Sequence, residues 1–294
     1  MKRLAPLLFL PALVLPARGA LAHGDHAVRV WTFDPVVLGL LLASAGLYGF
    51  GTLRLWRHAG RGRGVRHWQV LSYGGGWLLL AGALVSPLHW LGEHLFSAHM
   101  IEHEIVMAGA APLLALSRPT SAFLWALPPA LRRALGAAGR QPVVRRPWRW
   151  MTAPLSATLL HGAVIWLWHA PPLFEAAVRS EGLHRLQHLT FLLSALVFWW
   201  ALFRRAEFGA AVLHLFATMI HMTLLGALIT FAGRVLYVRQ TGFAEYWELT
   251  PLEDQQLAGL IMWVPAGTVY AAAALAFAAL WIHQSSRKPR HVPA

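Results

Sequence analysis

The chain has 294 residues, of which 57% are hydrophobic and only 13% are charged, and its formal net charge is +13. A soluble globular domain carries about 25% charged residues, so this composition excludes an ordinary water-soluble fold and an intrinsically disordered chain. The absence of cysteine excludes disulfides, thiolate zinc sites and iron–sulfur clusters, and the basic residues do not form the single stripe that binds nucleic acid.

The first 22 residues have the features of a secretory signal peptide. Lys2 and Arg3 precede a short apolar stretch, and Ala20-Leu21-Ala22 is a small–x–small cleavage pattern. The apolar stretch is shorter than the about 20 residues that a membrane-spanning helix needs, so we expect cleavage, with an uncleaved anchor as the alternative. Residues 23–35 would then form a short N-terminal segment outside the membrane.

Residues 36–282 are predicted to form an all-α membrane domain with seven transmembrane helices. Apolar runs of bilayer length fall near residues 36–56, 68–87, 95–116, 154–170, 186–203, 210–232 and 257–282. The longest connection, residues 117–150, contains an apolar and basic stretch from Ser121 to Leu135 that we expect to lie along the membrane surface. Residues 283–294 form a basic tail.

The charge distribution predicts the orientation of these spans. With the mature N-terminus outside, the inner connections and the tail hold 17 Lys and Arg residues, whereas the outer segments hold five. This asymmetry agrees with the positive-inside rule and predicts a multi-pass membrane protein with a cytoplasmic C-terminus. Eleven of the twelve acidic residues fall at the outer side, which indicates that this face interacts with cations.

The third span carries ionisable groups at an unusual depth. Its uninterrupted apolar run, Ile105 to Leu116, has twelve residues and cannot cross a bilayer alone, so the helix must extend back to His99. His99 and His103 are four residues apart and share one helix face, with Glu102 beside His99 and Met107 one turn deeper. Ionisable groups at this depth are costly unless they are paired or face the interior of the bundle.

Other histidines repeat this pattern at the same side of the membrane. His184 and His188 are again four residues apart where the fifth span begins, and His169 closes the fourth span. The connection before the third span adds His89, Glu93 and His94. Imidazoles spaced by one helical turn can bind a transition metal, and histidine with methionine in a chain without cysteine favours copper; zinc held by imidazole and carboxylate is the alternative.

The sequence therefore predicts a metal site at the outer face. The predicted ligands are His99, His103, His169, His184 and His188, and the predicted supporting residues are His94, Glu102, Met107 and Asp254. The competing interpretation is a hydrogen-bond network that ties the helices together. Isolated intramembrane histidines are typically such hydrogen-bond partners, and this is our interpretation of His161, His214 and His221.

Two further classes of function stay open at this point. A haem-binding electron-transfer protein would use two histidines at matched depth on facing helices, which His161 and His221 could supply. A permease for copper or a proton-coupled substrate would need a polar path across the whole membrane, whereas the inner halves of most spans are apolar. We expect no enzymatic activity, because no nucleophile, base and orienting group occur together.

Four blocks of sequence carry a family resemblance. They are His99-Met100-Ile101-Glu102-His103 through Ala110-Ala111-Pro112-Leu113-Leu114 and Arg118-Pro119; Trp166-Leu167-Trp168-His169 with Pro171; Leu183-His184 through Gln187-His188 to Phe198-Trp199-Trp200; and Leu252-Glu253-Asp254-Gln255-Gln256 with Ala258-Gly259 through Met262-Trp263. In this order, over roughly residues 70–282, the chain resembles the CtaG family of cytochrome c oxidase assembly factors.

The resemblance implies a role in assembly of caa-type haem–copper oxidases, with delivery of copper. It also implies the bacterial plasma membrane as the location, and subunits of the oxidase and copper chaperones as partners. The predicted spans add membrane lipid as a partner, and the scattered basic residues indicate no nucleic acid. The chain departs from the family pattern at Glu102, where the family often has Gln or a small residue, and at Glu104, where it often has an apolar residue.

Overall fold

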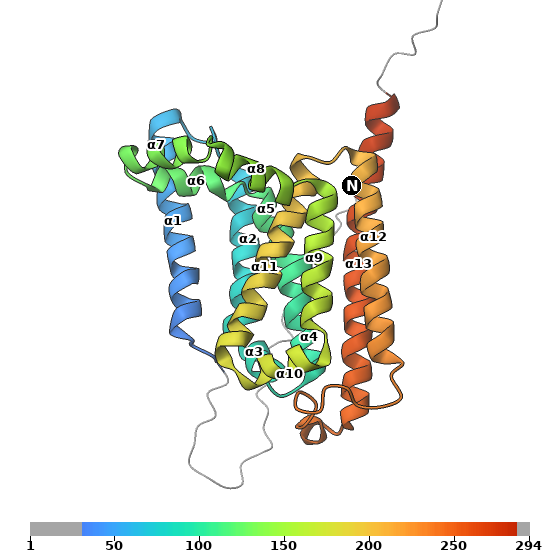
Figure 1. Cartoon of the computed structure of the whole chain (residues 1–294). Coiled ribbons are helices and arrows are strands. Elements are labelled where there is room, and N and C mark those ends of the chain that lie inside the picture. Colours follow the sequence, from blue (N-terminus) through green and yellow to red (C-terminus); the bar gives the residue numbers. More distant parts are fainter. Residues whose placement is uncertain (1–30, 287–294) are drawn as a thin grey trace, which may run out of the picture.

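The computed structural model describes residues 31–286, and over that range the chain forms helices and no strand. The predicted signal peptide, its cleavage site and residues 287–294 of the basic tail lie outside the described residues. The helices form an elongated bundle with shorter helices at both ends (Figure 1). The predicted all-α, multi-pass membrane fold is confirmed.

Seven segments run along the bundle. They are α1 (Pro35–Ala59), α2 (His67–Val85), the continuous run of α4 (Phe96–Glu104), η1 (Ile105–Ala110) and α5 (Ala111–Leu116), then α9 (Pro154–Trp168), α11 (Glu181–Arg204), α12 (Phe208–Thr230) and α13 (Pro251–Ser286). Within the described residues, five of these are long and apolar enough to cross a membrane on their own. The number rises to seven if two bent helix pairs, α4–α5 with α6 and α8 with α9, each count as one span.

Short helices distinguish the two ends of the bundle. One end, which we call the histidine end, carries α3 (Pro87–Gly92), α10 (Pro171–Arg179) and the 3₁₀ helix η2 (Ala244–Trp247). The other end, which we call the basic end, carries α6 (Pro119–Ala126), α7 (Pro129–Ala138) and α8 (Pro142–Met151). Most of these helices begin with proline, whose missing N–H and fixed φ suit the first helical position.

The third span extends back to Phe96, as its short apolar run requires, and contains a turn of π-helix. In this turn the amide of Ala111 bonds to the carbonyl of Val106, which leaves the carbonyl of Met107 without its usual α-helical donor. Pro112 has no N–H that could replace it. The indole Nε1 of Trp199 on α11 donates to this carbonyl at 3.0 Å, so the distortion ties the third and fifth spans together.

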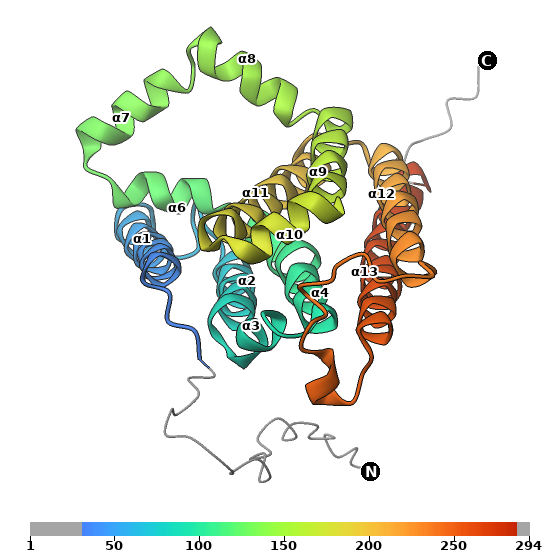
Figure 2. The same cartoon turned by 60° about the horizontal axis from the view of Figure 1, so that its bottom comes forward.

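Close contacts between helices depend on small residues. A Cβ atom at Gly51 on α1 would lie 1.8 Å from the carbonyl oxygen of Ala122 on α6, so only glycine fits there. Gly226 on α12 and Gly259 on α13 face one another in the same way, and added Cβ atoms would lie 2.7–2.8 Å from the opposing carbonyl oxygens. Figure 2 shows α12 and α13 as a pair at one side of the bundle.

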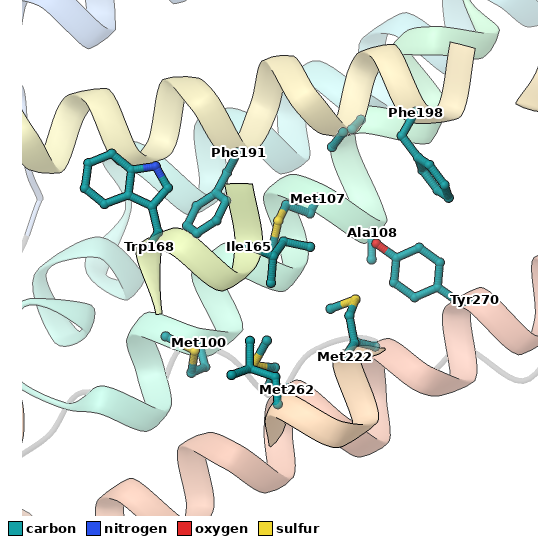
Figure 3. Packing of buried hydrophobic residues seen from close by; sticks show 14 of the residues in the cluster. Met100, Met107, Ala108, Ile165, Trp168, Phe191, Phe198, Met222, Met262 and Tyr270 are labelled. Atoms are coloured by element: carbon teal, nitrogen blue, oxygen red, sulfur yellow. The ribbon is translucent and has the colours of Figure 1, made fainter. Parts of the chain in front are cut away.

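The main hydrophobic core lies between the spans that carry the predicted site residues. It contains aromatic side chains and the buried methionines Met100, Met107, Met222 and Met262 (Figure 3). These four side chains are each about 1% exposed. The core therefore fixes the spacing of α4, α9, α11 and α13 immediately below the polar groups of the histidine end.

Candidate metal centre

Three of the predicted ligands meet in the buried space between α4 and α11. One ring nitrogen from each of His99, His103 and His188 lies within 4.8 Å of the others. The three side chains are 2%, 1% and 8% exposed. The one-turn spacing on α4 brings the rings of His99 and His103 together edge to face, with centroids 4.2 Å apart. The ring of His188 faces both from α11.

The two remaining predicted ligands border this group. Nε2 of His184 lies 2.9 Å from Nε2 of His188, and its ring stacks on that of His99 at 5.3 Å. His169, at the end of α9, lies 6.2 Å from His103 between ring centroids. Its Nδ1 donates to the carbonyl of Ile165 at 2.7 Å, so Nε2 is the ring nitrogen that has no partner among the described residues. The structure thus brings all five predicted histidines to one place.

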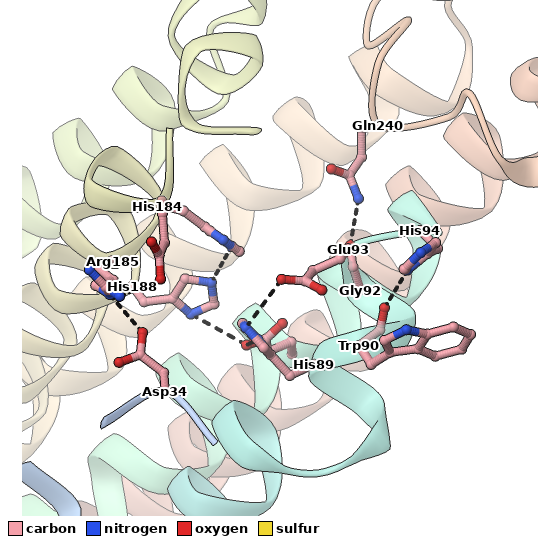
Figure 4. Close-up of polar contacts among 12 residues, drawn as sticks. Asp34, His89, Trp90, Gly92, Glu93, His94, His184, Arg185, His188 and Gln240 are labelled. Carbon is pink, nitrogen blue, oxygen red and sulfur yellow. Dashed lines mark hydrogen bonds and ion pairs between the residues drawn. The ribbon is translucent and has the colours of Figure 1, made fainter. Parts of the chain in front are cut away.

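A carboxylate and a sixth histidine complete the cluster. Glu102 is fully buried, and its Oε1 lies 2.7 Å from Nδ1 of His89 on α3 and 3.6 Å from Nδ1 of His188. Figure 4 shows His89 and His188 pointing toward one another from α3 and α11. Burial alone lowers the pKa of His89, but the hydrogen bond and the charge of Glu102 outweigh it and raise the pKa.

Gly92 makes room for this carboxylate. A Cβ atom at Gly92 would lie 3.0 Å from Oε2 of Glu102 and 3.3 Å from Cα of His99. The carbonyl of Gly92 accepts from Nε2 of Gln240 at 2.6 Å, which fixes the end of α3 against the long connection before α13 (Figure 4). The turn after α3 can therefore lie directly over the cluster.

Several buried polar atoms of the cluster have no hydrogen-bond partner among the described residues. They are Nε2 of His99, both ring nitrogens of His103, Nε2 of His169, Nδ1 of His188 and Oε2 of Glu102. Buried polar groups are normally paired, so this concentration of unpaired atoms calls for a ligand or water. A tetrahedral ion with bonds of about 2.0 Å holds its ligand nitrogens about 3.3 Å apart, so small side-chain movements would complete the site.

The predicted supporting residues have different places. Met107 lies one turn below His103 in the hydrophobic core, as expected from the spacing. His94 lies apart from the cluster: its Nδ1 bonds to the carbonyl of Trp90 at 2.7 Å, and its ring packs against aromatic side chains. Asp254 caps α4, because its two oxygens accept from the amides of Phe96 and Ser97 at 2.8 and 3.0 Å.

The sequence interpretation did not assign His89 to the site, although it placed this residue in the outer connection. The sequence signal for the turn before His89 was Ser86-Pro87. The second span ends there, and the hydroxyl of Ser86 caps α3, which turns back over the bundle. Only the fold shows that residue 89 then reaches Glu102, thirteen positions further along the chain.

The isolated intramembrane histidines lie deeper. Nδ1 of His161 lies 3.0 Å from the hydroxyl of Ser194, and Nδ1 of His214 lies 3.1 Å from that of Thr158. His221 lies against Gly162, where an added Cβ would be 3.3 Å from its Nε2. Two of the three thus make the interhelical hydrogen bonds expected of them.

Comparisons with known proteins agree with this architecture. Residues 46–284 match the profile of the family described as cytochrome c oxidase caa3 assembly factor. Uncharacterised proteins of Mycobacterium bovis and Mycobacterium tuberculosis are each 27% identical over 292 residues, covering 90% of this chain and 42% of their own length. One from Mycobacterium leprae is 26% identical over 276 residues, covering 88% of this chain and 40% of its own length.

The chain thus spans about two fifths of the length of the curated relatives that it matches. No solved structure matches it. The family match covers the second to sixth spans completely, with the whole histidine cluster, and it covers residues 46–59 of the first span and 251–284 of the seventh. The chain belongs to the cytochrome c oxidase caa3 assembly factor family.

Proposed function

We propose that this protein binds copper at its histidine end and hands it over during assembly of a haem–copper oxidase. The observation that carries the proposal is the convergence of His99, His103 and His188 in a buried space, where four of their ring nitrogens have no hydrogen-bond partner among the described residues. Neutral imidazole is a good copper ligand, and a chain without cysteine offers no thiolate to favour another soft-metal site. Family membership supplies the oxidase as the partner.

The cluster suits transfer better than permanent storage. Imidazole ligands come from different helices, and the bordering His184 and His169 offer further nitrogens beside the three central ones. An ion held by three ligands can exchange one of them for a neighbour without leaving the site. The cluster lies at one end of the bundle, on the inner side of the short helix α3, and this position supports handover to a partner at that end.

Substitution of single histidines tests the proposal. We expect His103→Gln and His188→Gln to fold, to lose copper in elemental analysis of the purified protein, and to fail to restore oxidase activity in a deletion strain. His94→Gln is the matched control, because His94 lies at the same end but outside the cluster. Full copper content and full oxidase maturation in both cluster variants would favour the alternative of a purely structural hydrogen-bond network.

An absorption spectrum separates copper from the haem alternative. The ring of His161 stacks on Phe198 with centroids 5.2 Å apart, and its Nδ1 is engaged by Ser194. His221 on α12 packs directly against Gly162 on α9, which leaves no room for a porphyrin between the two helices that carry these histidines. We therefore expect the purified protein to lack a Soret band, whereas an intense Soret band would support haem binding.

We infer that the histidine end faces outward and the basic end faces the cytoplasm. The 17 basic residues in the inner connections and tail predicted from the sequence, against five in the outer segments, support this orientation. Reporter fusions at Gly62, Gly139 and the C-terminus should report a cytoplasmic location, and a fusion near Gly242 should report the outside. A periplasmic signal at Gly139 would contradict the orientation. We propose a role in assembly without catalysis of a reaction.

A further inference from the structure

In the arc formed by α6, α7 and α8, α6 packs on α1, whereas α7 and α8 stand away from the rest of the bundle. Figure 2 shows the arc leaving the body after α6 and returning at α9. Every residue from 141 to 151 is exposed, and α7 has no buried residue. Helices of ten residues are marginal on their own in water, so an unpacked helix of this length needs a surface to cover it.

The two helices are amphipathic in the manner of interfacial helices. On α8, Val143, Val144 and Trp148 share one face, and Arg145 and Arg146 lie on the opposite face with Arg149. Exposure on the apolar face is high, with Val143 at 79%, Val144 at 48% and Trp148 at 44%. An apolar stripe with tryptophan, opposite a basic stripe, is typical of a helix that lies in the headgroup region of a bilayer.

Both ends of the arc are fixed at the level where the spans end. α6 begins three residues after α5, and Pro154 begins α9 three residues after α8 ends. Trp148 packs on Trp200 near the end of α11 with ring centroids 5.5 Å apart, and Nη1 of Arg205 donates to the carbonyl of Arg149 at 3.4 Å. The arc is therefore held at the membrane boundary.

The charge of this surface is uncompensated. Residues 129–151 contain six arginines, and no acidic residue occurs between Glu104 and Glu175. Among residues 31–286, the ion pairs formed by arginine involve only Arg185 and Arg239, both at the histidine end. At the inner edge of the arc, Arg118 and Arg204 add two like charges that repel one another.

We propose that the arc binds anionic phospholipid, with the apolar faces of α7 and α8 in the acyl-chain boundary and the arginines on headgroup phosphates. Guanidinium groups match phosphate geometry, and an anionic leaflet attracts clustered basic residues. The apolar stripe distinguishes a lipid surface from free phosphate, since a small anion would leave that stripe in water. The proposal is independent of the metal site.

Site-directed labelling of the full chain in nanodiscs tests the placement. Because the chain has no cysteine, Val143→Cys carries the only spin label. We expect the label to collide more often with oxygen than with a water-soluble nickel chelate when the nanodisc contains phosphatidylglycerol. Predominant nickel access would show that α8 faces water or awaits a protein partner, and would overturn the proposal.

Lipid retention tests the chemistry. By native mass spectrometry, the wild-type chain should retain phosphatidylglycerol several-fold over phosphatidylcholine, and inorganic phosphate should not displace it. The variant R145Q/R146Q/R149Q should lose this preference, whereas R57Q/R61Q/R63Q, with the same loss of charge at the same end but no apolar stripe, should keep it. Equal retention by both variants, or displacement by phosphate, would refute lipid binding by the arc.

Discussion

Replacement of Asp254 by asparagine should destabilise the protein without removing a metal ligand. Asp254 is fully buried at the start of α13, and its two oxygens accept from the backbone amides of Phe96 and Ser97. The N-cap residue of α4, Leu95, has no side chain that could do this. The carboxylate is thus an N-cap supplied by another helix, and it fixes the start of the helix that carries His99.

The magnitude follows from these two hydrogen bonds. Hydrogen bonds to a charged group contribute about 1.5–3 kcal/mol each, and a buried donor left unsatisfied costs about 1–3 kcal/mol. Asparagine keeps one accepting oxygen but turns an NH₂ group toward the second amide. We expect a loss of about 3 kcal/mol in the free energy of unfolding, which corresponds to roughly 10 °C in Tm.

Thermal unfolding followed by tryptophan fluorescence measures this loss, because the chain has 15 tryptophans. Glu253→Gln is the control, because Glu253 is exposed and its carboxylate bonds only to Thr250 in its own turn. The Tm of this variant should differ little from that of the wild-type protein. Copper content below the transition should be unchanged in Asp254→Asn. An unchanged Tm together with lost copper would refute the capping role and identify Asp254 as a charge partner of the metal.

Three smaller perturbations test other parts of the structure. Gly51→Ala should destabilise the fold by several kcal/mol, because the new methyl group overlaps the backbone of α6, whereas Gly49→Ala meets nothing within 4 Å and should be neutral in thermal unfolding. Trp199→Phe should cost about 1–2 kcal/mol, since the carbonyl of Met107 loses its donor; an unchanged Tm would contradict this. Burial acts to raise the pKa of Asp34, but the hydrogen bonds that it accepts from an arginine and two amides outweigh burial and lower the pKa. The wild-type chain should therefore lose stability as the pH falls below about 4, and Asp34→Asn should lose less stability over the same range.

The spans could be predicted from sequence because their signals are local. An apolar run of bilayer length identifies a span wherever it occurs, and the twelve-residue run Ile105–Leu116 was enough to predict that the third helix begins near His99. The convergence of the histidines followed from helix spacing together with a shared membrane face. Such arguments need no knowledge of which helices are neighbours.

The parts that could not be predicted depend on contacts between distant segments. Asp254 reaches an amide 158 positions earlier in the chain, and nothing in its local sequence indicates that it caps a helix there. His89 and His94 look equivalent in the sequence, but in the fold His89 contacts Glu102, whereas His94, just after α3, packs against aromatic side chains. Among buried polar residues, neighbours in space determine whether a group binds, caps or packs.

The charge of the site bears on the kind of copper ion that we expect there. In the histidine cluster, the buried Glu102 contacts His89 and His188, and the more exposed Glu93 lies 3.9 Å from Nε2 of His89. An ion in this buried space must be neutralised locally, because two unit charges 6 Å apart interact by about 3 kcal/mol even at an effective dielectric constant of 20. With Glu93 balancing a proton on His89, Glu102 would balance Cu(I), whereas a divalent ion would keep one uncompensated charge. For the copper-binding function proposed above we therefore expect the monovalent ion, and loading with Cu(I) should exceed loading with Zn²⁺ at equal free concentration.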